Sequence, residues 1–308
     1  MNSSNLAFVF PGQGSQKVGM LAAMAEQSSL IAETFAEASQ ELGYDLWDLV
    51  QNGEQEALNL TEKTQPILLT SSVALWRVWQ QHQGLQPSML AGHSLGEFSA
   101  LVCAGSLKFT DAVRLVRDRG QFMQTAVPVG EGAMAAVLGL DDAVIVDICA
   151  QSGAEAVNFN SPGQVVIAGK VAAVNKAIEL LTEAGAKRAM PLPVSAPFHT
   201  SLMRPAGEKL AEKIASLSVS APQIPVVHNV HAQTESDPEK IKALLVKQIY
   251  SPVKWTSCIE AMVAAGITTT LECGPGKVLS GLSKRIDRSL TGLNIEDPAS
   301  LEKALASL

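Results

Sequence analysis

Two short apolar runs, each followed by a glycine-containing turn and then by a helical pattern, restrict the fold of this chain most strongly. Leu6–Phe10 is stopped by Pro11-Gly12-Gln13-Gly14, and Met89–His93 is stopped by Gly92. Both runs predict strands. Helical spacing occupies the segments between and after them: Ser28–Leu42, Pro66–His82, Leu95–Ala104 and Asp111–Ala126. Because strands that alternate with helices build parallel sheets, we expect a helix-covered parallel sheet with its ligand site beyond the carboxyl ends of the strands.

The middle of the chain has a different order of elements, β-α-β-β-α-β. The predicted strands are Ala133–Leu138, Ala156–Asn160, Val165–Ala168 and Arg188–Leu192, and the predicted helices are Asp141–Gln151 and Val171–Ala184. This is the order of a ferredoxin-like unit, and Pro128 and Pro193 flank it. We therefore predict a small subdomain at residues 128–196, inserted into a large α/β subdomain formed by residues 1–127 and 197–308.

The large subdomain is predicted to resume after this insertion. Its further elements are a helix at Pro205–Leu217, a strand at Val226–Val230, a helix at Ile241–Gln248 and a strand at Thr269–Cys273. Residues 289–308 carry no chemistry that the sequence identifies.

Composition limits the classes of function. Of 308 residues, 47% are apolar and 17% are charged, which supplies a core and excludes disorder. The net charge of −7, without a Lys/Arg cluster, disfavours nucleic-acid binding. No run approaches the ~18–20 apolar residues of a membrane span, and Met1 to Gln16 lacks a leader pattern, so we expect a cytoplasmic protein without a membrane anchor. The four cysteines lack metal-ligand spacing.

The pentapeptide Gly92-His93-Ser94-Leu95-Gly96 fits the pattern G-x-S-x-G between a predicted strand and a predicted helix. The glycines relieve the crowding of a turn so tight that the serine oxygen is left exposed. The first amides of the following helix favour an anionic oxygen beside it. We predict Ser94 as a nucleophile, and the alternative is a tight turn with an incidental serine.

A serine nucleophile needs a base, because its free hydroxyl attacks poorly at neutral pH. Of the five histidines, His82 is expected to be solvated, and His228 and His231 are expected to be structural. His93 neighbours the serine on a strand, where successive side chains point to opposite faces. His199, before a predicted helix, is therefore the candidate base, with a capping or packing role as the alternative.

No acidic residue is marked as the third member of a triad. Asp237 lies in a polar loop, and Glu97 lies three residues after the predicted nucleophile on its helix, so neither has a special claim to that role. A carbonyl oxygen could orient the histidine instead, which would make a Ser-His dyad.

Arg119 occupies the centre of the apolar face of the predicted helix Asp111–Ala126, whereas Arg114 and Arg117 point away from that face. A guanidinium on a buried face must be paired with an anion. One explanation is an internal salt bridge. The other is bidentate binding of a substrate carboxylate, in a cleft shared with Ser94.

The glycine loop Pro11-Gly12-Gln13-Gly14-Ser15 follows the first predicted strand but lacks the Gly-Lys-Ser/Thr ending of a phosphate loop and the third glycine of a dinucleotide site. Nucleotide binding is therefore disfavoured. Its backbone N–H groups could serve an oxyanion instead, with a plain turn as the alternative. The similar loop Cys273-Gly274-Pro275-Gly276-Lys277 is predicted to be structural.

Taken together, these motifs resemble those of one enzyme family. They are Phe10-Pro11-Gly12-Gln13-Gly14-Ser15-Gln16, Gly92-His93-Ser94-Leu95-Gly96-Glu97, Arg119-Gly120, Asn158-Phe159-Asn160-Ser161-Pro162-Gly163-Gln164, Pro197-Phe198-His199 and Gly274-Pro275-Gly276-Lys277. In this order they resemble the malonyl-CoA:acyl carrier protein transacylases of dissociated fatty-acid synthesis. The resemblance implies an α/β-hydrolase-like large subdomain with an inserted ferredoxin-like small subdomain.

The resemblance also implies a ping-pong mechanism. Ser94 would take the malonyl group from coenzyme A, His199 would act as base and then as acid, and Arg119 would hold the free carboxylate. The phosphopantetheine thiol of acyl carrier protein would then attack the malonyl-serine ester. No metal or redox cofactor is implied, and we expect a monomer.

Further residues take roles by the same resemblance. The backbone amides of Gln13 and Leu95 would form the oxyanion hole, and the main-chain carbonyl of Gln248 would orient the histidine. Phe198, before the histidine, resembles the malonyl-selective members rather than the methylmalonyl-selective ones. The alternatives are a serine carboxylesterase or thioesterase, a discrete polyketide-type acyltransferase, and a catalytically silent acyl-binding or scaffold protein.

Overall fold

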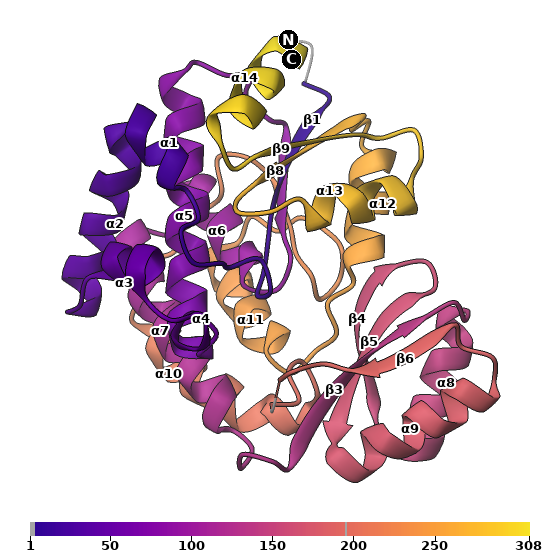
Figure 1. The fold of residues 1–308 in the computed structure, drawn as a ribbon. Helices are drawn as coiled ribbons and strands as arrows, with labels where there is room; N and C mark the ends of the chain where they lie inside the picture. Colours follow the sequence, from indigo (N-terminus) through magenta and orange to yellow (C-terminus); the bar gives the residue numbers. More distant parts are fainter. Residues whose placement is uncertain (1–3, 195) are drawn as a thin grey trace.

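The first apolar run forms the central strand of the larger of two sheets. In the computed structural model, which describes residues 4–194 and 196–308, five parallel strands lie in the order β7-β2-β1-β8-β9 (Figure 1). They are β1 (Leu6–Phe10), β2 (Met89–Gly92), β7 (Val226–Val227), β8 (Thr269–Cys273) and β9 (Thr291–Ile295). The parallel sheet expected from the alternation of strands and helices is confirmed.

Both faces of the central strand are buried, which explains why its sequence is apolar throughout rather than alternating. Leu6, Phe8 and Phe10 belong to one hydrophobic cluster, and Ala7 and Val9 belong to another on the opposite face. The larger side chains therefore face the thicker of the two helical layers.

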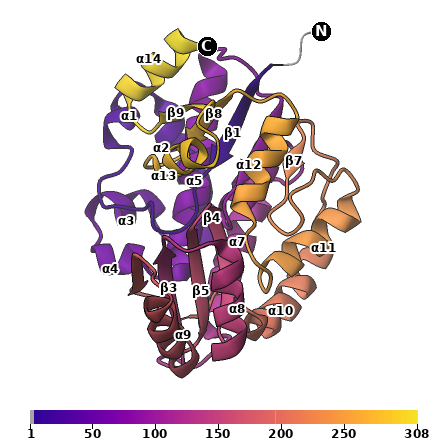
Figure 2. The same ribbon diagram turned by 90° about the vertical axis from the view of Figure 1, so that its right-hand side faces the viewer.

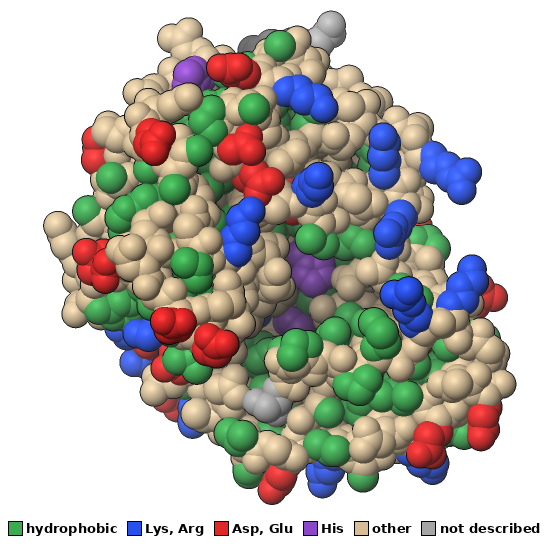
Figure 3. All heavy atoms as spheres, viewed as in Figure 1, with side chains coloured by type: hydrophobic (Ala, Val, Ile, Leu, Met, Phe, Trp, Pro, Cys, Tyr) green, Lys and Arg blue, Asp and Glu red, His purple; other side chains and the backbone are tan. Residues whose placement is uncertain are grey.

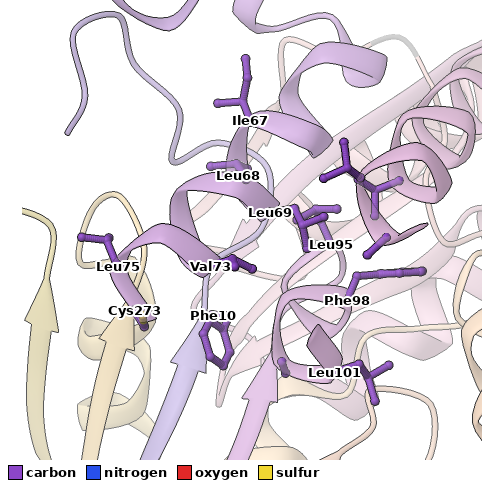
Figure 4. Packing of buried hydrophobic residues seen from close by; sticks show 14 of the residues in the cluster. Phe10, Ile67, Leu68, Leu69, Val73, Leu75, Leu95, Phe98, Leu101 and Cys273 are labelled. Carbon is purple, nitrogen blue, oxygen red and sulfur yellow. The ribbon is translucent and has the colours of Figure 1, made fainter. Parts of the chain in front are cut away.

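The thicker layer is made mainly by helices from the first half of the chain, with later helices beside them (Figures 1 and 2). These are α1 (Ala22–Gln27), α2 (Ser29–Leu42), α3 (Leu46–Asn52), α4 (Gln55–Leu58), α5 (Thr61–Gln81), α6 (Gly96–Cys103), α7 (Phe109–Thr125), α10 (Arg204–Ala215) and α11 (Pro238–Gln248). Figure 4 shows Leu69 and Val73 of α5, and Phe98 of α6, packed around Phe10 at the end of β1. The opposite face is covered by α12 (Trp255–Ala264) and α13 (Val278–Ile286).

The middle of the chain forms a separate antiparallel sheet with the strand order β4-β5-β3-β6. Its elements are β3 (Gly132–Leu138), α8 (Asp142–Ser152), β4 (Glu155–Ser161), β5 (Gln164–Lys170), α9 (Val171–Glu183) and β6 (Arg188–Pro191). The two helices cover one face around Ile145, Val165 and Leu181, a cluster distinct from those of the large sheet. The ferredoxin-like order predicted from the sequence is confirmed.

Some predictions concern residues that the structure does not describe. Residue 195, within the predicted small subdomain, lies outside the described residues. So do residues 1–3, which belong to the segment Met1 to Gln16 that was expected to lack a leader. The limits of the two subdomains at residues 128 and 196 stay predictions.

No helix of the described ranges is long and apolar enough to cross a membrane.

Three departures from the sequence prediction lie in the large subdomain. The strand predicted at Val226–Val230 ends at Val227, because the chain turns there and the Ala232 amide donates to the His228 carbonyl at 2.9 Å. The short helices α1, α3 and α4 and the 3-10 turn η1 (Ser201–Met203) were not predicted. Neither were α12, β9 and α14 (Pro298–Ser307), although β9 pairs along its whole length with β8.

Candidate active site

The pentapeptide around Ser94 forms a sharp turn between β2 and α6. Ser94 has a φ of 52°, in the left-handed region that side chains rarely adopt. A Cβ on Gly92 would lie 1.8 Å from the Gly96 carbonyl carbon, and a Cβ on Gly96 would lie 2.0 Å from the Phe10 carbonyl oxygen. Both glycines are therefore required for the turn to close against β1.

Asn229 holds this strained turn from the other side. Its side-chain oxygen accepts from the Ser94 amide at 2.8 Å, and its side-chain nitrogen donates to the Gly92 carbonyl at 2.8 Å. Asn229 was not predicted as a site residue, because the apolar run Val226–Val230 placed it inside a strand. An asparagine just after a short strand is the one local signal that could have indicated a bonding role.

Ser94 and His199 lie within hydrogen-bonding distance. The Ser94 Oγ and the His199 Nε2 are 2.8 Å apart, and His199 Nδ1 is 2.8 Å from the main-chain oxygen of Gln248. A carbonyl only accepts, so Nδ1 carries the proton and Nε2 is left to accept from the serine hydroxyl. Gln248 ends α11, where carbonyl groups lack partners within the helix.

His199 is held in its neutral form. Its side chain is buried, and burial together with the nearby Arg119 cation lowers the pKa of His199 to about 3. The residue is therefore unprotonated at neutral pH and able to accept a proton.

Arg119 projects from α7 into the same site and is 0% exposed. Its Nη1 donates to Gln65 Oε1 at 2.8 Å, and its Nη2 donates to Gln248 Oε1 at 2.7 Å and to Ser94 Oγ at 3.3 Å. The guanidinium carbon also lies 5.2 Å from the centre of the Phe98 ring.

No carboxylate is paired with Arg119 in the described part of the chain, and its Nε–H has no acceptor there. The internal salt bridge that was one explanation for a buried Arg119 is therefore not observed among the described residues. Burial lowers the pKa of Arg119 to about 10, although the negative charge of Glu97 opposes that shift, so the group stays charged at neutral pH.

Close packing of two helices sets the position of Arg119. A Cβ on Gly120 would lie 2.6 Å from the Thr61 carbonyl oxygen. Glycine thus lets α7 approach α5, and this approach brings the Arg119 guanidinium to the Gln65 side chain.

Glu97 lies at the centre of a buried hydrogen-bond network beside the turn. Its carboxylate is fully buried and accepts from His228 Nδ1 at 2.7 Å, from the Asn229 amide at 2.9 Å and from Gln248 Nε2 at 2.9 Å. Glu97 does not contact His199 and is not the third member of a triad, but its three partners, which come from a distant part of the chain, give it a different place beside the site.

The remaining histidines lie apart from the serine hydroxyl. His93 Nε2 lies 2.8 Å from Asn160 Oδ1 on β4, which links the end of β2 to the small sheet. His228 is buried against Glu97, and His82 is exposed. No cluster of three or more His, Cys, Asp or Glu side chains able to hold a metal is present among the described residues.

The two amides predicted for an oxyanion hole lie on neighbouring segments. The loop after β1 packs on the turn, because a Cβ on Gly12 would lie 2.6 Å from the His93 carbonyl oxygen. Within the described ranges, neither the Gln13 nor the Leu95 N–H has a hydrogen-bond acceptor. Leu95 also caps the N-terminus of α6, where the helix dipole favours negative charge.

A groove runs between the two subdomains (Figure 3), and His93, next to Ser94, contacts Asn160 of the small sheet. In Figure 3, histidine side chains lie inside the groove, apolar side chains line the wall formed by the small subdomain, and Lys and Arg side chains border one end. The geometry therefore gathers a serine hydroxyl, a neutral imidazole and a buried cation without an ion-paired carboxylate in the described part of the chain.

Comparison with known proteins agrees with this geometry. Residues 7–293 match the family model of the acyl transferase domain, the class to which such a fold and site point. A malonyl CoA-acyl carrier protein transacylase of Salmonella typhimurium is 57% identical over 98% of this chain and 99% of that protein. One of Bacillus subtilis is 46% identical over 99% of this chain and 98% of that protein. The chain therefore belongs to the malonyl CoA-acyl carrier protein transacylase family.

Solved structures show the same likeness. The acyl carrier protein S-malonyltransferase of Vibrio cholerae has a TM-score of 0.96 and 58% identity, covering 97% of this chain and 99% of that one. A malonyl-transacylase solved in complex with its type II PKS acyl-carrier protein has a TM-score of 0.98 and 52% identity, covering 99% of this chain and 100% of that one.

Proposed function

We propose that this chain transfers the malonyl group from malonyl-CoA to the phosphopantetheine thiol of acyl carrier protein, for fatty-acid chain elongation. The observation that carries this proposal is the position of Ser94 Oγ, 2.8 Å from His199 Nε2 and 3.3 Å from Arg119 Nη2. One hydroxyl thus contacts both a base and a cation that has no anionic partner among the described residues. The names of the relatives agree with this activity.

In the first half-reaction, Ser94 Oγ attacks the thioester carbonyl of malonyl-CoA while His199 Nε2 takes the hydroxyl proton. The carbonyl oxygen becomes an oxyanion, for which the N–H groups of Gln13 and Leu95 are the proposed donors. The carbon–sulfur bond then breaks, His199 returns the proton to the departing thiolate, and malonyl-Ser94 remains.

In the second half-reaction, the phosphopantetheine thiol enters from the same groove and gives its proton to His199. Its sulfur attacks the ester carbonyl, and the bond to Ser94 Oγ breaks as His199 returns the proton to the serine. The main-chain oxygen of Gln248 holds the imidazole in the required tautomer during both steps.

Arg119 supplies selectivity in this proposal. A charged guanidinium in a buried site favours an acyl group that brings its own carboxylate. The malonyl carboxylate fits that requirement, and an acetyl group leaves the cation without an anion.

The proposed partners are malonyl-CoA and the phosphopantetheine-bearing carrier protein. The Lys and Arg side chains at one end of the groove are compatible with the phosphates of both (Figure 3). The mechanism requires no metal or redox cofactor, and we propose that the enzyme acts as a monomer in the cytoplasm.

A second candidate is malonyl transfer to the carrier protein of a polyketide synthase. The observation that favours it is the 52% identity to a malonyl-transacylase solved with a type II PKS acyl-carrier protein. The chemistry at Ser94 would be the same, and only the carrier protein would differ.

The test is incubation with malonyl-CoA, alone and with holo carrier protein of the fatty-acid or the polyketide type. Transfer to the fatty-acid carrier at a higher kcat/KM supports the proposal, and a preference for the polyketide carrier favours the second candidate. Release of free malonate without transfer would indicate a thioesterase, and an unchanged mixture would indicate a binding or scaffold protein.

A further inference from the structure

Glu97 is a buried carboxylate that the proposed mechanism does not use. It lies beneath the turn, 0% exposed, and does not touch the serine hydroxyl or the His199 ring. Among the described residues, no Lys or Arg is ion-paired with it. Burying such a group is costly, so its three hydrogen bonds require an explanation in terms of what they position.

The side-chain amide of Gln248 links Glu97 to Arg119. The Gln248 Nε2 donates to Glu97 Oε2 at 2.9 Å and to the Ser94 carbonyl at 3.0 Å, and its Oε1 accepts from Arg119 Nη2 at 2.7 Å. All of these contacts are buried or partly buried.

An amide has one end that donates and one end that accepts, whereas a carboxylate only accepts and a guanidinium only donates. Glu97 therefore permits only one orientation of the Gln248 amide, with the nitrogen on Glu97 and the oxygen on Arg119. The reverse orientation would place oxygen against oxygen at one end and donor against donor at the other.

We propose that Glu97 is a positioning residue that determines acyl selectivity: it fixes the Gln248 amide, whose oxygen then holds the Arg119 guanidinium beside Ser94. This inference rests on the proposed role of Arg119 in binding the malonyl carboxylate. Glu97 itself contacts no substrate in this proposal.

Two variants separate the position of the Glu97 oxygen from its charge. Glu97→Asp keeps the charge but withdraws the carboxylate by one methylene group. Glu97→Gln removes the charge but keeps an oxygen within reach of Gln248. The amide nitrogen of the new glutamine can donate to His228 Nδ1, provided that the His228 ring carries its proton on Nε2 instead. The His228 Nε2 has no partner among the described residues, so this change of tautomer breaks no observed contact.

The measurement is the ratio of kcat/KM for malonyl-CoA to kcat/KM for acetyl-CoA. Misplacing a binding group by about 1 Å can cost up to about 100-fold, so we expect Glu97→Asp to lower the ratio about tenfold. We expect Glu97→Gln to keep it within about threefold of the parent value, because the acceptor stays in place. The folded fraction cancels in this ratio, so partial unfolding does not produce the effect.

Two further variants complete the experiment. Arg119→Met must itself lower the ratio; an unchanged ratio would overturn the carboxylate-binding role of Arg119, and the inference with it. In a Gln248→Met background, Glu97→Asp should have no further effect, because the link to Arg119 is already removed.

The inference is overturned if Arg119→Met lowers the ratio while Glu97→Asp leaves it unchanged. It is also overturned if Glu97→Gln lowers the ratio as much as Glu97→Asp, which would assign the effect to charge. A merely structural Glu97 predicts that the rates with both substrates and the melting temperature fall together at a constant ratio. Each of these three results would overturn the role of Glu97 in selectivity and would leave the proposed malonyl transfer itself intact.

Discussion

Replacing Arg119 with alanine tests the basis of selectivity. Arg119 is 0% exposed, its guanidinium is bonded to the amide oxygens of Gln65 and Gln248, and no carboxylate of the described chain forms an ion pair with it. A substrate carboxylate would supply the missing negative charge. We therefore expect Arg119→Ala to weaken the reaction of malonyl-CoA far more than that of acetyl-CoA.

The magnitude follows from the cost of truncating one partner of a buried charged pair, about 2–5 kcal/mol. Each 1.4 kcal/mol is a tenfold change, so the malonyl-to-acetyl ratio should fall by about 30-fold or more. Acetyl transfer itself could rise, because the variant removes a cation that the acetyl complex leaves without an anion.

The assay is the rate of acyl transfer to holo carrier protein from each thioester, measured beside a thermal melting curve. Arg119→Met is the matched control, since it removes the charge while retaining most of the side-chain volume. Both variants leave the Gln65 and Gln248 oxygens without their donor, so a lower melting temperature is expected for each.

The result that would refute this reasoning is a preserved malonyl-to-acetyl ratio in a destabilised variant. Both rates would then fall together, and Arg119 would be a residue that supports the fold rather than one that binds the carboxylate.

Further predictions concern the turn and the base. Ser94→Ala should abolish the covalent malonyl-enzyme, measured by intact-protein mass spectrometry after mixing with malonyl-CoA; an adduct of undiminished yield would place the nucleophile elsewhere. His199→Ala should slow transfer by about 10²–10⁴-fold, because binding and the oxyanion donors remain, and an unchanged rate would remove His199 from the mechanism. Folding lowers the pKa of His199 from 6.5 to about 3, so as the pH falls through this window the unfolded chain gains a proton that the folded chain does not, and stability is lost. Compared with the parent, His199→Gln should therefore lose less melting temperature between about pH 7 and pH 4, and equal losses would contradict the shift. Gly92→Ala should lower both melting temperature and adduct yield, because its Cβ would lie 1.8 Å from the Gly96 carbonyl carbon; a parent-like variant would show that the turn can relax.

Local sequence patterns were sufficient to predict the elements that surround the site. The strand at Leu6–Phe10, the turn around Ser94, and the order β-α-β-β-α-β each depend on apolar periodicity and on glycines within a few residues of one another. Arg119 was singled out for the same reason, since its place on an apolar helical face is a property of one helix. Such patterns are visible in sequence because they reflect the geometry of single elements.

The contacts that support the site were decided by the tertiary structure. Ser94 and Asn229 are separated by 135 positions, and Glu97 and Gln248 by 151. Nothing in the neighbourhood of Glu97 distinguishes a buried carboxylate from a solvated one on a helix. A buried polar group must find its partners wherever the packing places them, and that pairing is settled only when the helices and sheets assemble.

The same distinction explains the strand β9 at Thr291–Ile295, which has little pattern of its own. It forms because the edge of β8 offers unpaired backbone groups and because Leu293 and Ile295 add to the core already present. The sequence by itself determined the α/β class, the inserted subdomain and the candidate nucleophile, base and cation. The three-dimensional packing decided that a single residue, Gln248, contacts His199 through its backbone and Arg119 through its side chain, because only folding brings the end of α11 against both the segment before η1 and α7.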